Sequence, residues 1–132
     1  SFVGGNNAFS GRLTATNGTE ATIDTPDGTF SARTSSHSAL AVGDQSIVFV
    51  RPESVFFTQA SEQGNLVDVT LVSQEFEGHF WHLVLETPGG RAVRMSVMND
   101  GAPARFQPGE KLTIGFSAAN AIVLPKGELA AE

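Results

Sequence analysis

The sequence predicts an all-β protein built from two similar halves, each an incomplete small barrel, that share one core. No window keeps apolar residues at the i, i+3, i+4, i+7 spacing of an amphipathic helix, and Gly or Pro interrupts almost every long stretch. Short runs rich in β-branched and aromatic residues occur instead, bounded by turn pairs such as Asn17-Gly18 and Asp27-Gly28. Two landmarks then recur in the same order, which indicates a duplication.

Ten runs fit short strands, because each combines β-branched or aromatic residues with turn signals at its ends. Short strands at this spacing are typical of a barrel or a sandwich. The expected strands are Phe9–Ala15, Glu20–Thr25, Thr29–Arg33, Ser46–Arg51, Val55–Thr58, Leu66–Phe76, His79–Thr87, Arg91–Val97, Lys111–Phe116 and Ala121–Leu124.

The duplication rests on two pairs of matching segments. Thr25–Gly28 recurs as Thr87–Gly90, an offset of 62 residues, and Val42–Val50 matches Pro108–Phe116, an offset of 66 residues. The second copy is therefore longer between the landmarks, and we place an insertion near Asn99–Ala104.

A Gly followed by an acid precedes a strand in both copies, as Gly43-Asp44 and as Gly109-Glu110. Gly adopts the positive φ that reverses the chain, and the acid stays solvated at the turn. Alternate residues of the following strand are expected to point inward. They are Val48 and Val50 in the first copy and Ile114 and Phe116 in the second.

The expected organisation is a first half at residues 2–58, a second half at 64–125 and a C-terminal tail at 126–132. About 60 residues bury too little surface to be secure alone, so the halves are expected to complete each other's core. Ten Phe with no Tyr favour a dry interior. The expected core rings are Phe49, Phe56, Phe57, Phe76 and Phe116.

Composition excludes several classes of function. The 132 residues carry a formal net charge of −6, a poor match for nucleic acid, and no Cys for a zinc finger or a thiol nucleophile. The phosphate-loop pattern GxxxxGK[ST] and the nucleophile pattern GxSxG are both missing. No apolar run is long enough to cross a bilayer, and the N-terminus does not read as a secretory signal. We expect no catalytic residue, metal site or cofactor in this chain.

Acids and imidazoles crowd together at Glu75–His82. His79 and His82 are three residues apart, which places them on opposite faces of a strand and argues against a shared metal ion. The cluster is therefore interpreted as a solvated hairpin rim. Trp81 alternates with Leu83 and Leu85, so it is expected to cover the barrel or an interface edge, with ligand stacking as the alternative.

Several short motifs resemble one family when they are taken in order. Phe2–Asn7 fits Phe-x-Gly-x-x-Asn, Val42–Asp44 leads to an Arg-Pro-Glu exit at Val50–Glu53, and the closing turn and strand are Pro108–Glu110 and Ile122–Pro125. Together they resemble the transport-associated OB (TOBE) domain, the C-terminal regulatory domain of ATP-binding-cassette importer ATPases. Residues 2–125 carry the resemblance. At the position of the family's Pro-Glu pair before the last strand, this chain has Ala118-Ala119.

The resemblance implies an OB-like fold and a non-catalytic domain that helps two ATPase subunits dimerise at the cytoplasmic face of the cell membrane. Gln74–Gly78 and Met98-Asn99 look closer to polyamine, iron and related small-solute importers. The implied partners are the protein's own upstream ATPase domain, a second ATPase subunit and the transporter's membrane subunits, without nucleic acid. ATP and magnesium would belong to the upstream domain, and the abrupt start at Ser1 suggests an excised fragment.

Arg51 and Glu53 are the expected contacts to that ATPase domain or to the partner subunit, because they share one face if the backbone stays extended around Pro52. A local surface ion pair is the alternative.

A second functional hypothesis is a barrel that binds a small cation or oxyanion in the groove between the halves. The acidic balance favours a cation. The candidate ligand contacts are Asp68, Glu75, Glu77 and Trp81.

Overall fold

The computed structural model describes residues 6–35, 40–58, 64–99 and 106–126. All ten expected strands are present there, with ends shifted by at most two residues. Two three-residue 3-10 helices, η1 (Pro52–Ser54) and η2 (Ala118–Asn120), follow the fourth and ninth strands. The strands are β1 (Asn7–Thr16), β2 (Glu20–Thr25), β3 (Gly28–Thr34), β4 (Gln45–Val50), β5 (Phe56–Phe57), β6 (Asn65–Glu77), β7 (Phe80–Glu86), β8 (Ala92–Met98), β9 (Lys111–Phe116) and β10 (Ala121–Pro125).

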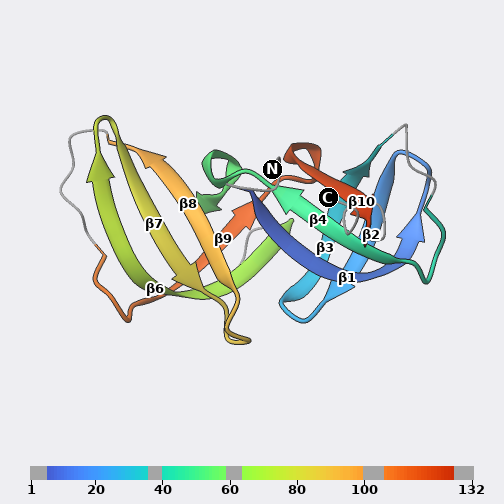
Figure 1. Ribbon diagram of the computed structural model, residues 1–132, viewed down its shortest axis with the longest axis horizontal. Coiled ribbons are helices and arrows are strands. Elements are labelled where there is room, and N and C mark those ends of the chain that lie inside the picture. Colours follow the sequence, from blue (N-terminus) through green and yellow to red (C-terminus); the bar gives the residue numbers. More distant parts are fainter. Residues whose placement is uncertain (1–5, 36–39, 59–63, 100–105, 127–132) are drawn as a thin grey trace.

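The strands form two lobes that lie end to end (Figure 1). One lobe is a closed barrel in the order β1-β2-β3-β10-β4, and the other is a five-stranded sheet in the order β5-β9-β6-β7-β8. The all-β prediction of two small OB-like barrels is therefore confirmed, with the second one open along one edge.

The two halves of the sequence exchange a strand. β5 follows the first four strands along the chain but pairs with β9 in the second sheet, at Phe56↔Gly115 and Phe57↔Ile114. β10 ends the second half but lies in the first barrel, antiparallel to β4 and parallel to β3. Each half thus contributes an edge strand to the other, and this is why the two halves share one core.

The predicted duplication extends to individual hydrogen bonds. In each copy, a Leu in the first strand donates its amide to the acid of the Gly-acid turn and accepts a bond from the Gly. Gly43 has φ +97 and Gly109 has φ +92, the conformation predicted for the chain reversal. The four bonds are Leu13 N to Asp44 O at 3.0 Å, Gly43 N to Leu13 O at 2.7 Å, Leu71 N to Glu110 O at 2.9 Å and Gly109 N to Leu71 O at 2.7 Å.

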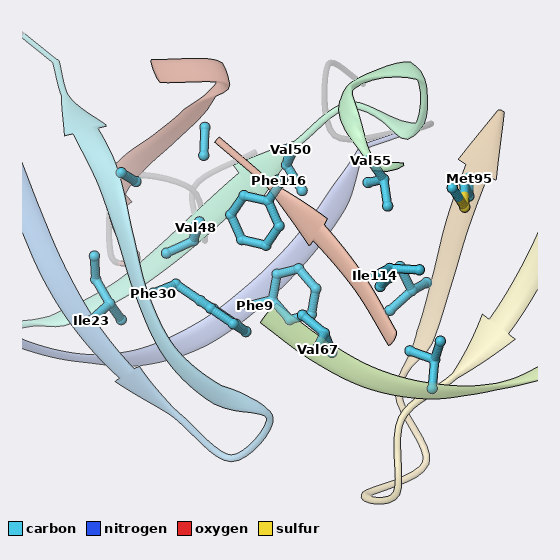
Figure 2. Close-up of a cluster of buried hydrophobic side chains, with 14 of the residues drawn as sticks. Phe9, Ile23, Phe30, Val48, Val50, Val55, Val67, Met95, Ile114 and Phe116 are labelled. Carbon is cyan, nitrogen blue, oxygen red and sulfur yellow. The ribbon is translucent and has the colours of Figure 1, made fainter. Parts of the chain in front are cut away.

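Three Phe rings form the centre of the core, between the lobes (Figure 2). Phe9 lies edge-on to Phe30 at 5.0 Å and stacks with Phe116 at 6.0 Å, and Phe30 meets Phe116 at 5.2 Å. Phe9 and Phe30 belong to the first barrel and Phe116 to β9 of the second sheet, so the contact crosses the boundary between the halves. The inward positions predicted at Val48, Val50, Ile114 and Phe116 are all buried.

The predicted set of core rings was partly wrong. Phe49 and Phe116 are buried and Phe57 is half-buried, but Phe56 is 42% exposed and Phe76 is 49% exposed. Phe56 lies on the two-residue strand β5 between an inward Val55 and an inward-leaning Phe57, so the strand alternation turns it outward. Phe76 lies beyond a bulge in β6, on a hairpin that extends past the core.

Some expectations fall on other parts of the chain. Most of the insertion placed at Asn99–Ala104, all of the tail except Lys126, and Phe2–Gly5 of the N-terminal motif lie outside the described residues. Within the described ranges, no helix has the length and apolar character needed to cross a membrane.

Candidate functional site

Two Asn side chains join the halves in the same way. Asn7 at the start of β1 donates Nδ2 to Arg94 O at 2.8 Å and accepts from Arg94 N at 2.7 Å. Asn65 at the start of β6 donates Nδ2 to Ser31 O at 2.9 Å and accepts from Ser31 N at 2.7 Å. Both amides are at least 95% buried, and each satisfies both backbone groups of one residue in the opposite half. The two contacts are related by the duplication.

An ion pair joins the halves without such a counterpart. Arg91 Nε lies 3.1 Å from Asp27 Oδ2, with the Asp27 side chain 4% exposed and the Arg91 side chain 38% exposed. Arg91 Nη1 also donates to Ala8 O at 2.9 Å. At the 62-residue offset, Asp27 corresponds to Gly89 and Arg91 to Thr29, so this contact cannot form a second time. The ion pair fixes the β2–β3 turn against the β7–β8 turn.

Two adjoining hollows form a groove beside this junction, which we call the junction groove. The first has a volume of about 400 Å³ and the second about 350 Å³. Both are lined by Asp68, Pro88 and Thr113. The first hollow is completed by Val69, Thr70, Lys111 and Leu112, and the second by Pro26, Asp27, Leu66 and Gly89. Residues of both halves therefore line one concave surface.

The groove places four polar side chains on one face of the β6–β9 pair. Asp68 lies opposite Thr113, and Thr70 lies opposite Lys111. Thr113 Oγ1 donates to Asp68 Oδ1 at 3.3 Å. Within the described ranges, neither the Asp68 carboxylate nor the Lys111 ammonium is in an ion pair. The groove thus offers one charge of each sign and two hydroxyl groups, which suits the binding of a small charged molecule.

The structure does not bring the four candidate ligand residues together. Asp68 lies in the groove, whereas Glu75 and Glu77 follow seven and nine residues later on β6, past the bulge between Leu71 and Ser73. At about 3.3 Å per residue, the two acids lie roughly 23 and 30 Å along the strand from Asp68. Trp81 lies opposite Phe76 at the same far end. Only Asp68 remains a candidate for a contact in the groove.

The His82 imidazole contacts one acid of the hairpin and one hydroxyl group of β8. His82 Nε2 lies 3.5 Å from Glu77 Oε1, and His82 Nδ1 is 3.1 Å from Ser96 Oγ. His79 is exposed at the turn. The described residues contain no group of three or more potential metal ligands. Trp81 is half-buried against the core and packs on Phe76 at 5.1 Å, the covering position that the strand alternation predicts.

The geometry assumed for Arg51 and Glu53 was wrong. Residues Pro52–Ser54 form the 3-10 helix η1, so the backbone is not extended and the two side chains do not share a strand face. Both are exposed, and neither takes part in an ion pair within the part of the chain that the structure describes. Arg51 and Glu53 therefore do not form the alternative local ion pair. That they contact an ATPase domain or a partner subunit stays a prediction. Ala118-Ala119 occupy the matching turn η2.

Sequence reasoning missed the two junction Asn residues and the Asp27–Arg91 pair. A signal for the Asn residues was present, because each begins a strand in which the next residue on the same face, Phe9 or Val67, is apolar and buried. The ion pair carried no such signal, since its members are 64 residues apart and occur once.

Comparisons with known proteins agree with this architecture. The sequence profile of the TOBE domain matches residues 48–124. Among solved structures, that of the cytoplasmic molybdate-binding protein ModG with molybdate bound is similar, with a TM-score of 0.76, 23% sequence identity and coverage of 90% of this chain and 96% of that chain. At this identity the likeness concerns the fold. A comparison with curated protein sequences gave no match. Because the profile spans more than half of its length, the chain belongs to the TOBE domain family.

Proposed function

We propose that this chain is a non-catalytic module that binds a small charged solute in the junction groove. The observation that carries the proposal is the groove itself, where Asp68 and Lys111 lie on one sheet face next to Thr113 and Thr70 and form no ion pair with any described residue. Membership of the TOBE family and the fold shared with ModG, a protein described as molybdate-binding, support it.

The two ends of the groove suit opposite charges. Asp68 and Thr113 present oxygen atoms to an ammonium group, whereas Lys111 and the Thr70 hydroxyl present donors to an oxyanion. The shallow surface lies between the β2–β3 turn of the first half and the β6–β9 pair of the second. A solute bound there contacts both halves, so its binding strengthens their association.

Calorimetric titration of the chain with spermidine, putrescine, molybdate and sulfate tests this function. We expect binding of an amine that Asp68→Asn weakens about tenfold, or binding of an oxyanion that Lys111→Gln weakens about tenfold, the loss typical of one charged contact. Glu20→Gln, an exposed acid on β2, is the matched control and leaves binding unchanged. Absence of heat with all four solutes, or binding that neither groove variant alters, contradicts the proposal.

The second candidate function is the regulatory domain of an ATP-binding-cassette importer ATPase. Family membership over residues 48–124, which include the exposed turn at Arg51–Glu53, favours it. In this proposal the chain acts at the cytoplasmic face of the cell membrane beside an upstream ATPase domain that holds ATP and magnesium, with a second ATPase subunit and membrane subunits as partners. The importers of polyamines, iron and related small solutes are the class we propose. The gene sequence upstream of Phe2 tests it: a GxxxxGK[ST] loop supports this function, and a start codon adjacent to Phe2 removes it.

A further inference from the structure

The far end of the β6–β7 hairpin exposes an unusual amount of apolar surface. Of the six large hydrophobic side chains exposed in the described ranges, three lie on β6, β7 and β8 near this end. They are Phe76 (49% exposed), Phe80 (39%) and Met98 (67%). In Figure 1 the end of this hairpin is the part of the second lobe farthest from the first barrel.

Strand register assigns these side chains to two faces. Phe80 lies opposite Met98 on β8 and opposite Glu77 on β6. His82, which lies opposite Glu75 and Ser96, is on the same face as Phe80. Phe76 and Trp81 lie on the other face, toward the core. We call the first set the Phe80 face, made of Glu75, Glu77, Phe80, His82, Ser96 and Met98.

This surface has no counterpart in the first half. The matching hairpin between β1 and β2 ends in the polar residues Asn17, Gly18 and Thr19. From the equivalent Leu to the equivalent Thr, the second copy takes 16 residues (71 to 87) and the first takes 12 (13 to 25). The four extra residues lengthen the hairpin beyond the core, where Phe80 and Met98 lie opposite each other and exposed. Adjoining exposed apolar side chains indicate a contact surface.

Charge identifies the kind of surface that fits. The Phe80 face carries the carboxylates of Glu75 and Glu77 beside Phe80 and His82, and Arg94, which lies opposite Val84, is the first basic residue farther along the same face of β8. A second copy of this chain would bring the same carboxylates toward each other, and an anionic membrane would repel them. An apolar surface bordered by Lys and Arg is complementary.

We propose that the Phe80 face is a docking surface for a partner protein that presents an apolar patch bordered by basic side chains. Phe80 and Met98 insert into the apolar patch, and Glu75 and Glu77 pair with the basic border. The proposal is independent of solute binding, because the junction groove lies at the other end of β6.

A synthetic amphipathic helix with Leu on one face and Lys along its borders is the probe, and the same peptide with Glu in place of Lys is its counterpart. Binding is followed by anisotropy of the labelled peptide and by the fluorescence of Trp81, the only Trp of the chain. We expect the Leu/Lys peptide to bind and the Leu/Glu peptide not to bind. Phe80→Ser and Met98→Ser each weaken binding about tenfold, as for an apolar anchor of an interface.

Val42→Ser is the matched control, since Val42 is 65% exposed on a turn of the first half, and it leaves binding unchanged. Met98→Ser keeps the test valid if Phe80→Ser perturbs the hairpin, because Met98 is 67% exposed. Equal binding of both peptides, or no effect of either variant, contradicts the proposal. Sedimentation that shows self-association lost in Met98→Ser, or Met98-dependent binding to phosphatidylcholine vesicles, assigns the face to another occupant and also overturns it.

Discussion

The two repeats have the same strand order but differ in closure. In the first, β10 pairs in parallel with β3 at Ile122↔Arg33 and Val123↔Thr34 and closes the barrel. In the second, β5 takes the place of β10 but holds two residues, and in the described part of the chain it pairs with β9 alone. The two lobes therefore differ in the strand that each receives from the other half, β10 in the first and β5 in the second.

The comparison shows which part of the sequence decides closure. The Gly-acid turns, the junction Asn residues and the bulges at Leu13 and Leu71 are common to both repeats. They build the four-stranded unit, and they do so equally in the closed and the open lobe. Within the described residues, closure depends on the length of the incoming strand: β10 reaches the free edge of the first barrel, and the two residues of β5 do not reach that of the second sheet.

The largest expected effect tests whether the two lobes unfold together. Phe116→Ala removes a ring of β9 that packs on Phe9 and Phe30 of the first barrel, and we expect a loss of about 3–5 kcal/mol of unfolding free energy. Urea unfolding is followed by Trp81 fluorescence, which reports the second lobe, and by circular dichroism, which reports both. Both signals should show the same unfolding midpoint, at a lower urea concentration than in the unchanged chain.

Phe56→Ala is the matched control, because Phe56 is 42% exposed on β5 and its truncation should cost far less. Two separate transitions in Phe116→Ala, with only the Trp81 signal displaced, would show that the lobes do not share one cooperative core.

A smaller effect distinguishes the closed lobe from the open one. Truncation of either junction Asn leaves a backbone N–H and C=O without their partner. Asn65→Ala leaves the backbone groups of Ser31 without a partner in the closed barrel and should lower the unfolding free energy by about 2–3 kcal/mol. Asn7→Ala does the same to Arg94 on the edge strand β8. Water can replace the lost amide there, so the loss should be about 1 kcal/mol. Urea unfolding measures both costs.

Hydrogen exchange supplies the second readout. The Arg94 amide should exchange faster in Asn7→Ala, while the Ser31 amide in Asn65→Ala stays better protected because β10 lies beside the same strand. An Asn7 cost equal to or above that of Asn65 would mean that water does not reach the edge of β8.

The fold was accessible from the sequence because its signals are local. Alternating apolar residues, turn pairs and the repeated Gly-acid turn each lie within a few residues, and they placed every strand. The sequence predicted that the two halves share a core, but it did not predict the exchange of β5 and β10. No local pattern indicates which sheet such a strand joins. The errors at Phe56 and Phe76 have the same origin, because an apolar residue on a strand does not say whether its face is covered.

The site was less accessible. Asp68 was singled out for its charge, but Lys111, Thr113 and Asp27 join it only through the pairing of β6 with β9 and the packing of two turns. Glu75 and Glu77 share its strand, and the length of that strand separates them from the groove. Glu53 lies on a helical turn that begins just after Arg51, and the Arg-Pro-Glu motif alone did not indicate this turn.

The smallest effect tests the equivalence of the repeats at their most similar point. Gly43 and Gly109 have φ +97 and +92, and an added Cβ at either meets nothing within 4 Å. Ala at each position therefore lowers the unfolding free energy only through the strain of the left-handed backbone, by about 1 kcal/mol, and the two values should agree. Asn, which tolerates this conformation, should cost less than Ala at both sites. Chemical unfolding of the four variants measures the change in unfolding free energy. A larger loss for Gly43→Ala than for Gly109→Ala would show that the closed barrel restrains its turn more than the open sheet does, although the two turns form the same hydrogen bonds.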